Sequence, residues 1–335
     1  MRAQTEARVV QFTGPRAVEI ATVDVCRPPG AVLLRTLYSG ISSGTELLAY
    51  RGELPPDTAL DDKLSGLSGG TFRYPFSYGY SCVAAVEAGS EAFPEGSKVF
   101  AFAPHQDRFA SAGADLMLLD DDADPRQATL FPLVETALQM TVDAGQVLGQ
   151  PVIVVGQGAV GVLVALMLQW AGAQVLAVEP QLWRRDVVAS LGVDAVGPDE
   201  APGVAMDLTH GHGVPLVVEA SGNPAALASS LSLLAHEGVA LVGSWYGTKT
   251  VSLPLGADFH RRRLTIKSSQ VSTIPAEQQA RWDVRQRRVT ARSLLSRLPL
   301  AAVATTEFAF PAAAEAYAAL DRGVEGVLHV ALRYD

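Results

Sequence analysis

The sequence has few cysteines, no long apolar run and no excess of positive charge. Its only cysteines, Cys26 and Cys82, exclude a disulfide framework and a cysteine-rich structural zinc lobe. The longest apolar run, near residues 159–173, is interrupted by glycines and is too short to cross a bilayer. The net charge of −9 argues against a broad nucleic-acid surface. The start, MRAQTEARVVQF, has no apolar signal-peptide core, so we expect a soluble cytoplasmic protein that binds neither nucleic acid nor membrane.

The chain is long enough for two domains, and its pattern changes near residue 130. A length of 335 residues exceeds what one hydrophobic core usually serves. Residues 8–130 contain short strands separated by Gly and Pro, which is typical of a β-barrel-like domain. After residue 128 helices alternate with continuously apolar strands, the pattern of a buried parallel sheet. We therefore predict an α/β chain with a β domain followed by a parallel-sheet domain.

A glycine-rich motif lies between a predicted strand and a predicted helix. The strand ends at Val155, and the G-x-G-x-x-G pattern that follows it opens the helix. In this context the glycines allow a tight turn, close approach of a pyrophosphate and close packing of the helix on the strand. The alternative is a purely structural glycine turn. The motif predicts a dinucleotide site that includes Gly156, Gly158, Ala159, Val160 and Gly161.

The next predicted strand, VLAVE, ends in an acid that bears on the choice of cofactor. Glu179 could bind both ribose hydroxyls and would repel a 2′-phosphate, so NAD(H) is favoured. Arg184 and Arg185 on the following helix would make NADP(H) possible if they turned inward, and otherwise are solvated helix residues.

Three further positions lie where later sheet strands end. Gly222 follows the strand VPLVVE, and Val242 and Gly243 end the strand VALVG. Nucleotides bind at the carboxyl ends of strands in doubly wound sheets, so these residues are candidates to line the cofactor. The alternative is that the glycines serve only to end the strands.

Several motifs together resemble the medium-chain dehydrogenase/reductase superfamily. They are YSGISSGTE at 38–46, YGYSCVAAVEAGSEAFPEGSKVFAF at 78–102, VETA at 134–137, the glycine motif, and SLGVDAV at 190–196. The resemblance implies a GroES-like β-barrel catalytic domain at 1–134, to which 271–335 returns, and a Rossmann domain at 135–270. It also implies that Ser269 lies beside the nicotinamide. SGISSGTE and the GY pair make the chain most similar to the branch related to bacteriochlorophyllide dehydrogenase.

The chain departs from the zinc-containing members of that superfamily at the metal ligands. Those members have Gly-Ile-Cys where this chain has Gly-Ile-Ser42, and Gly-His-Glu where it has Gly-Tyr80-Ser81. Because the loop has one extra residue, the position of the cysteine corresponds to Ser42 or Ser43. Only Glu135, at the third ligand position, keeps a ligand-capable side chain. A catalytic zinc takes about three protein ligands, and His105 and Glu46 do not sit where the family places its ligands. We therefore expect no zinc.

Without a metal, hydrogen-bond donors must stabilise the reacting oxygen. Tyr80 is the best candidate as donor or general acid, because a phenol is protonated at neutral pH. Ser42 and Thr45 could extend a proton relay, with His105 as its outlet to solvent. Glu135 could orient one of them or bind a substrate hydroxyl or amine. The alternatives are a buried aromatic for Tyr80, turn residues for Ser42 and Ser43, and an exposed loop residue for His105.

A basic tract covers His260–Arg263, Lys267 and Arg281–Arg288. Arginines bind carboxylate or phosphate well, so this tract could recognise an anionic group on the substrate. The alternative is a solvated helix face with i, i+4 ion pairs such as Asp283 with Arg287.

Together these features predict a zinc-independent NAD(P)(H)-dependent oxidoreductase that interconverts an alcohol and a carbonyl in a small polar, perhaps anionic, metabolite. Reduction of a conjugated C=C bond or quinone is one alternative, and a non-catalytic nucleotide-binding redox sensor is another. The strand VALVGSW is expected at a sheet edge, and since edges are commonly paired we predict a homodimer.

Overall fold

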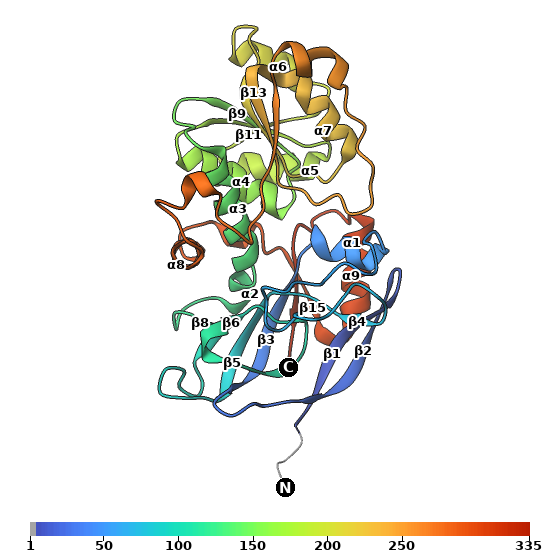
Figure 1. Cartoon of the computed structure of the whole chain (residues 1–335). Coiled ribbons are helices and arrows are strands. Elements are labelled where there is room, and N and C mark those ends of the chain that lie inside the picture. Colours follow the sequence, from blue (N-terminus) through green and yellow to red (C-terminus); the bar gives the residue numbers. More distant parts are fainter. Residues whose placement is uncertain (1–4) are drawn as a thin grey trace. The chain divides into compact units, whose positions relative to one another are not determined.

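The computed structural model describes residues 5–335 and divides into two compact units (Figure 1). Unit 1 comprises Met1–Pro132 and Ala304–Asp335, and unit 2 comprises Leu133–Val303. The sequence places the return to the first domain at residue 271, but residues 271–303 lie in unit 2. The reason is that α8 (Val284–Leu295) carries a buried arginine, Arg287, that bonds to a helix of unit 2.

Unit 1 is built mainly of antiparallel strands in two sheets. One sheet has the order β2-β1-β4, and the other has the order β15-β16-β3-β5-β6-β8, with β7 paired to β3. The strands are β1 (Thr5–Gly14), β2 (Ala17–Val25), β3 (Val32–Ile41), β4 (Phe76–Ser77), β5 (Cys82–Ala88), β6 (Lys98–Ala101), β7 (Arg108–Ser111), β8 (Leu116–Leu118), β15 (Thr306–Ala309) and β16 (Val330–Arg333). The helices are α1 (Thr45–Arg51), α2 (Pro125–Ala128) and α9 (Ala313–Arg322).

The core of unit 1 is aromatic and includes the long polar loop of residues 52–75. The rings of Phe12 and Phe76 stack with centroids 5.0 Å apart, and Tyr317 meets Phe12 edge-on at 5.2 Å. Leu67 and Phe72 of the loop are buried in the same cluster. Because these apolar side chains anchor it, the loop is a packed part of the unit.

Unit 2 contains a six-stranded sheet with the order β11-β10-β9-β12-β13-β14. All neighbouring strands are parallel. The strands are β9 (Pro151–Val155), β10 (Gln174–Val178), β11 (Asp194–Val196), β12 (Val214–Glu219), β13 (Leu234–Val242) and β14 (Thr265–Ser268). The helices are α3 (Phe131–Ala144), α4 (Ala159–Trp170), α5 (Leu182–Ser190), α6 (Ala201–Leu208), α7 (Pro224–Ser230) and α8. The predicted α/β fold, with a β domain and a doubly wound parallel sheet, is confirmed.

Continuous apolar runs explain why these segments form a central parallel sheet. In β9, Ile153 and Val154 are fully buried, and in β12 Val217 is fully buried as well. Strands covered on both faces cannot alternate apolar and polar residues, so β-branched runs are favoured. The apolar helix α4 follows β9 directly and is also largely buried, which brings the glycine motif to the carboxyl end of the central strand.

One prediction about the sheet is wrong. The strand that contains VALVG, β13, is not at the edge, because β14 pairs with it in parallel from Val239↔Thr265 to Val242↔Ser268. The homodimer was inferred from an exposed edge at this strand. That reason no longer holds, and the homodimer stays a prediction without structural support.

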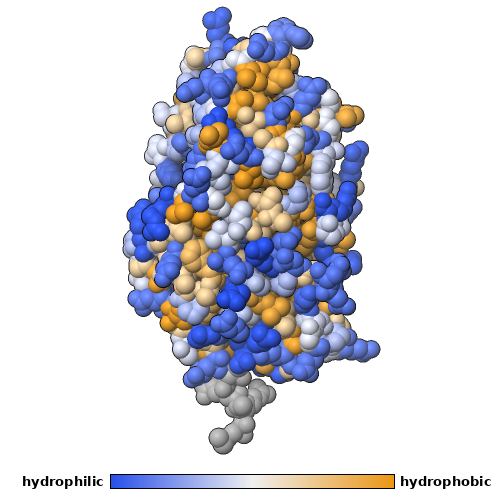
Figure 2. Space-filling view, turned by 180° about the vertical axis from the view of Figure 1, so that it is seen from behind, coloured by the Kyte–Doolittle hydropathy of each residue, from blue (hydrophilic) through white to orange (hydrophobic). Residues whose placement is uncertain are grey.

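The surface carries polar residues among scattered apolar ones, as Figure 2 shows for one face. Among the residues whose exposure the structure describes, Leu148 is the most exposed large apolar side chain, at 79%. In the described part of the chain, none of the helices has the length and apolar character needed to span a bilayer.

A buried histidine of unit 1 predicts how the stability depends on pH. His329, next to β16, is 2% exposed, and burial followed by the charge of Arg126 lowers its pKa from 6.5 to about 3. Between these two values the unfolded chain binds a proton at this site and the folded chain does not. The free energy of unfolding therefore falls as the pH is lowered through this window, by up to about 1.4 kcal/mol per pH unit from this residue.

We expect His329→Gln to flatten this slope, because the variant has no proton to take up there on unfolding. Denaturant unfolding measured across the window from about pH 3 to 6.5 gives the slope. The control is His260→Gln, which changes an exposed histidine. An identical slope in wild type and His329→Gln would contradict the prediction.

Candidate active site

The glycine motif forms a loop that has no room for side chains at two positions. Gly156 follows β9 with φ of +88°, and a Cβ there would lie 2.5 Å from the Cα of Ser221. At Gly161 a Cβ would lie 1.8 Å from the carbonyl oxygen of Gly156. These contacts are to backbone atoms that cannot yield without moving the loop, so both positions require glycine.

The middle of the loop is open, unlike its ends. Gly158 is the N-cap of α4 and has no side-chain cap, and a Cβ built on it would meet nothing within 4 Å. Ala159 and Val160 follow as the first turn of the helix. The amide groups of that turn and the helix dipole favour a negative charge at this end. A closed glycine cradle beside an open helix N-terminus fits the pyrophosphate of a dinucleotide.

Glu179 lies directly against this loop, where the sequence predicts ribose recognition. The carboxylate is 3% exposed and accepts hydrogen bonds from the amide of Gln157 at 2.8 Å and that of Gln181 at 3.0 Å. Arg184 Nη1 is 3.9 Å from the same carboxylate. Arg185 turns instead to Glu200, at 3.4 Å. Of the two arginines considered for NADP(H), only Arg184 therefore lies beside the acid.

A second buried glutamate, which sequence reasoning missed, holds the next loop. Glu219 ends β12 with no exposed surface and accepts hydrogen bonds from the Ser221 amide at 2.7 Å and the Tyr246 hydroxyl at 2.8 Å. Ser221 is the residue that packs on Gly156. Because Glu219 fixes the Ser221 amide, it also stabilises the glycine loop. The sequence does contain a signal for Glu219, because the apolar strand VPLVVE ends in an acid just as VLAVE does.

The other predicted cofactor residues lie at the carboxyl ends of β12, β13 and β14. The Gly222 amide donates to Ser244 Oγ at 2.9 Å. The Ser269 amide donates to the Val242 carbonyl at 2.8 Å, and the Gly243 amide donates to that of Glu219 at 2.9 Å. Gly243 is required by packing, since a Cβ there would lie 2.2 Å from Met140 Cε. They lie at the end of the sheet where a nucleotide would bind, but the amide groups of Gly222, Gly243 and Ser269 all donate hydrogen bonds within the protein.

Glu135 lies on α3 in a buried polar row rather than in an open site. Its Oε1 accepts hydrogen bonds from Arg287 Nε at 3.1 Å, Arg287 Nη2 at 2.9 Å and Arg288 Nε at 3.3 Å. One turn on, Gln139 accepts from Arg287 Nη1 at 2.6 Å and donates to Asp143 at 2.9 Å. Arg287 is 1% exposed. Two guanidinium groups therefore bind the carboxylate that the resemblance places at a metal-ligand position.

These contacts correct part of the basic-tract hypothesis. Arg287 pairs with Glu135, whereas Asp283 caps α8 through the Gln286 amide, so the predicted Asp283–Arg287 ion pair is wrong. Arg262 donates to the Leu234 carbonyl at 3.0 Å, and Arg263 Nε bonds to a nearby glutamate, Glu237, at 2.8 Å. Leu234 begins β13 and residues 260–263 precede β14, so His260–Arg263 lie at the amino ends of these strands, opposite the nucleotide end.

In unit 1 the structure brings Tyr80, Ser42 and Thr45 together. Tyr80 is partly buried, packs against the aromatic core and shares hydrogen bonds with the side chains of Ser42 and Thr45. Burial, followed by the charge of Glu46, raises the pKa of Tyr80 to about 12, while the two hydroxyls act in the opposite direction. The phenol is therefore protonated at neutral pH and able to donate a hydrogen bond.

His105 is not the predicted outlet to solvent. Its side chain has no exposed surface, and its Nε2 lies 2.8 Å from Oε2 of Glu46, which is equally buried. The ring packs on Gly79, where a Cβ would lie 2.5 Å from Cδ2. The prediction failed because the sequence APHQ looks like a loop, and nothing local indicates a buried acid 59 positions away.

The residues at the family's metal positions do not fit zinc. Ser81 Oγ donates to the Thr129 carbonyl at 2.5 Å, Ser42 and Tyr80 offer only neutral hydroxyls, and the arginines bind Glu135. Neutral hydroxyls are poor zinc ligands. Across residues 5–335, moreover, His, Cys, Asp and Glu side chains form no group of three or more that could hold a metal.

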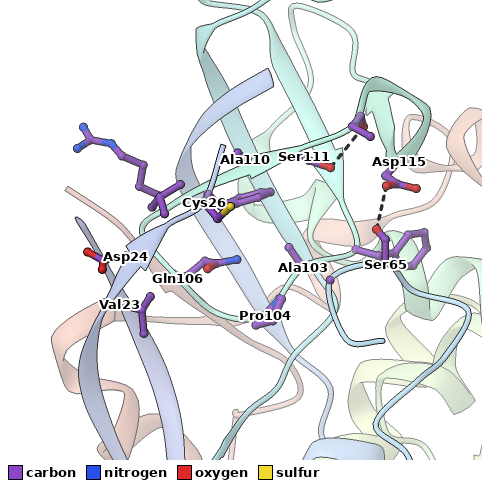
Figure 3. Close-up of a pocket in the computed structure, with 16 residues that line it drawn as sticks. Val23, Asp24, Cys26, Ser65, Ala103, Pro104, Gln106, Ala110, Ser111 and Asp115 are labelled. Carbon is purple, nitrogen blue, oxygen red and sulfur yellow. Dashed lines mark hydrogen bonds between the residues drawn. The ribbon is translucent and has the colours of Figure 1, made fainter. Parts of the chain in front are cut away.

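Unit 1 also has a cavity of about 410 Å³ between the end of β2 and β7 (Figure 3). Cys26, Gln106 and Arg108 are among its lining residues, and on its rim Ser65 Oγ donates to Asp115 at 2.8 Å. None of the predicted catalytic residues lines it. The cavity is therefore separate from the cluster of Tyr80, Ser42 and Thr45, which we call the Tyr80 cluster.

The buried ion pair predicts a large loss of stability. Arg287→Ala removes the buried guanidinium that donates two hydrogen bonds to Glu135 Oε1 and leaves only the partly exposed Arg288, and we expect it to lower the free energy of unfolding by about 3–5 kcal/mol. Arg285→Ala, on the exposed side of the same helix, is the control and should stay within about 0.5 kcal/mol of wild type. Denaturant titration of both variants measures the difference, and equal losses would show that the pair does not matter.

Comparison with known proteins finds similar sequences among dehydrogenases. The family described as "Zinc-binding dehydrogenase" matches residues 159–285. The L-threonine 3-dehydrogenase of Pyrococcus horikoshii is 35% identical over 132 residues, and the match spans only 38% of each chain. The 2-desacetyl-2-hydroxyethyl bacteriochlorophyllide A dehydrogenase of Cereibacter sphaeroides is 27% identical over 259 residues, 71% of this chain and 73% of that one.

Solved structures show the same fold over almost the whole chain. The 2R,3R-butanediol dehydrogenase of Bacillus subtilis superposes with a TM-score of 0.79 at 18% identity and covers 98% of this chain and 100% of its own. An alcohol dehydrogenase of Escherichia coli CFT073, solved in complex with NADH, has a TM-score of 0.76 at 14% identity and covers 98% and 99%. The partial sequence matches and the shared fold agree with the motifs along the chain: this chain is similar to zinc-binding dehydrogenases and has the fold of these solved dehydrogenases.

Proposed function

We propose that the protein is an NAD(P)(H)-dependent oxidoreductase that interconverts an alcohol and a carbonyl without zinc. The observation that carries the proposal is the phenol of Tyr80, held by Ser42 and Thr45 where zinc-containing relatives have metal ligands. Dehydrogenase relatives and the dinucleotide loop of unit 2 support the reaction class.

Unit 2 would hold the cofactor with the loop after β9. The amides of the N-cap Gly158 and of Ala159 in the first turn of α4 would bind the pyrophosphate, and Glu179 would face the ribose. A bound nicotinamide supplies or accepts the hydride. Glu179 favours NAD(H), because a 2′-phosphate would meet a carboxylate that is already fixed by two backbone amides. Arg184 beside it is the feature that keeps NADP(H) possible.

Unit 1 would supply the proton and the hydrogen bond to the reacting oxygen. In the reducing direction Tyr80 donates its hydroxyl proton towards the oxygen as negative charge develops there, and it regains a proton through the hydroxyls of Ser42 and Thr45. In the oxidising direction the transfer runs in reverse, and Tyr80 passes its own proton to these hydroxyls as it takes the proton of the alcohol. With a pKa of about 12, the phenol stays in the donor form throughout the neutral range. Ser42 and Thr45 orient the hydroxyl and can pass on the proton.

The substrate is proposed only as a polar alcohol or carbonyl compound. An anionic substrate group has lost support, because Arg287 is used inside unit 2 and His260–Arg263 lie at the amino ends of the strands. A cytoplasmic location stays a prediction from the sequence.

The cofactor site is tested with two glycine variants. Gly156→Ala introduces a Cβ at φ of +88° and against the Ser221 backbone, whereas Gly192→Ala has a similar φ of +82° and open space around it. Both should lose about 1–2 kcal/mol of stability from backbone strain, and Gly156→Ala should lose more because its Cβ also meets the Ser221 backbone. Only Gly156→Ala should weaken NADH binding, by about tenfold or more, which equals 1.4 kcal/mol.

Calorimetric titration of wild type and both variants with NADH and NADPH gives the affinities. We expect wild type to bind NADH more tightly. Tighter binding of NADPH than of NADH would indicate that Arg184 recognises the ribose end of the cofactor. An equal loss of NADH affinity in Gly156→Ala and Gly192→Ala would show that the glycine loop is not the binding site.

The role of Tyr80 is tested by Tyr80→Phe. Removing a donor to a developing oxyanion lowers kcat by about 10²–10³-fold, and we expect this loss with little change in NADH affinity. Tyr38→Phe, which removes a hydroxyl bonded to Glu307 on the surface of unit 1, is the matched control. Turnover is followed by nicotinamide absorbance with a panel of carbonyl compounds, and full activity of Tyr80→Phe would refute the proposal.

A further inference from the structure

A buried carboxylate with several donors lies behind the Tyr80 cluster. Glu46, in the first turn of α1, has no exposed surface. Its Oε1 accepts a hydrogen bond from the Ser42 amide at 2.8 Å, and its Oε2 accepts one from the Tyr317 hydroxyl at 2.5 Å. His105 Nε2 lies 2.8 Å from the same Oε2. A carboxylate at such a site needs all these partners, because an unpaired buried charge is costly.

The histidine continues the network on its other side. His105 Nδ1 lies 2.7 Å from Ser39 Oγ, which lies 2.9 Å from the Tyr334 hydroxyl. An ionised carboxylate only accepts, so Nε2 of His105 must be the donor to Glu46. In a neutral ring Nδ1 then accepts from Ser39, and Ser39 accepts from Tyr334. For a carboxylate at Glu46 and a neutral ring at His105, the hydrogen bonds run from Tyr334 through Ser39 and His105 to Glu46.

This network closes the loop that carries the two hydroxyls beside Tyr80. The Ser42 amide donates to Glu46 Oε1, and the Glu46 amide donates back to the Ser42 carbonyl at 3.0 Å. Ser42 and Thr45 lie within this closed segment, and both hydrogen-bond Tyr80.

The other side of Tyr80 is held by the same histidine. The His105 amide donates to the Tyr78 carbonyl at 3.3 Å, and the His105 ring fills the space beside Gly79. The segment before Tyr80 and the loop in front of its hydroxyl are thus both tied to the pair of Glu46 and His105.

We infer that Glu46 and His105 are positioning residues that fix the Tyr80 hydroxyl between Ser42 and Thr45. The inference deepens the proposed function and rests on it for the catalytic consequence. Neither residue need touch substrate: Glu46 sets the loop geometry, and His105, as the Nε2–H tautomer, sets the side chain of Glu46. A small displacement of a catalytic group can cost about 10²-fold in rate, so the pair has a measurable effect on turnover.

The first test is the tautomer of His105, read by nitrogen NMR on the full-length wild-type protein. We expect a protonated Nε2 and an unprotonated Nδ1. In Glu46→Gln the amide can donate to Nε2, which should reverse the chain so that Nδ1 carries the proton. A wild-type His105 protonated on Nδ1 alone would overturn the assigned direction.

The second test compares Glu46→Gln with Glu46→Ala and His105→Asn. The amide oxygen of Gln can still accept from the Ser42 amide, so Glu46→Gln should keep more activity than Glu46→Ala. We expect kcat to fall by about 10–100-fold in Glu46→Ala and His105→Asn, with NADH affinity unchanged because that site belongs to unit 2. His236→Asn, an exposed histidine of unit 2, is the control.

The third readout does not depend on turnover. The ring signals of Tyr80, assigned by their loss in Tyr80→Phe, should shift and broaden in Glu46→Ala and His105→Asn but not in His236→Asn. Unchanged Tyr80 signals in both variants would overturn the positioning role. A wild-type protein that binds NADH but turns over no carbonyl would refute the proposed function, and the tautomer and ring signals would still decide the positioning role.

Discussion

A buried carboxylate must be met by hydrogen-bond donors, and this requirement organises both units. Glu46 and Glu219 have no exposed surface, and Glu135 and Glu179 are each 3% exposed. An unpaired buried charge would lower the free energy of unfolding by an amount comparable to the whole stability of a typical domain. Each of these glutamates therefore has hydrogen-bond donors around it, which are backbone amides, hydroxyls, a histidine or guanidinium groups. The segments that converge are the ones on which the proposed site is built.

In unit 2 this requirement shapes the nucleotide end of the sheet. Glu179 fixes the glycine loop through the Gln157 amide, and Glu219 fixes the neighbouring loop, which packs on Gly156. Two strand-end acids therefore make the cradle rigid before any ligand arrives. Preorganisation of this kind reduces the cost of ordering the loops on binding.

The need to pair buried carboxylates also determines the role of Glu135. Glu135 keeps the residue type found at a metal-ligand position, yet Arg287 and Arg288 bind it and turn it into a structural anchor for α8. In unit 1 the hydroxyls of Tyr80, Ser42 and Thr45 lie together, and the proposed function assigns them the role that a metal would otherwise have. The proposed function therefore combines the fold of dehydrogenases with side chains suited to hydrogen-bond catalysis.

The sequence alone determined the features that leave a local trace. The parallel sheet follows from continuous apolar strands, and the dinucleotide loop from Gly156 and Gly161, whose backbone geometry tolerates no side chain. The sequence also showed directly that Ser42 and Tyr80 stand where similar zinc-containing proteins have Cys and His. Only the tertiary structure decided which polar residues meet: Glu46 with His105 across 59 positions, and Glu135 with Arg287 across 152. A charged side chain looks the same in the sequence whether it is solvated or buried, and its partner is set by how distant elements pack.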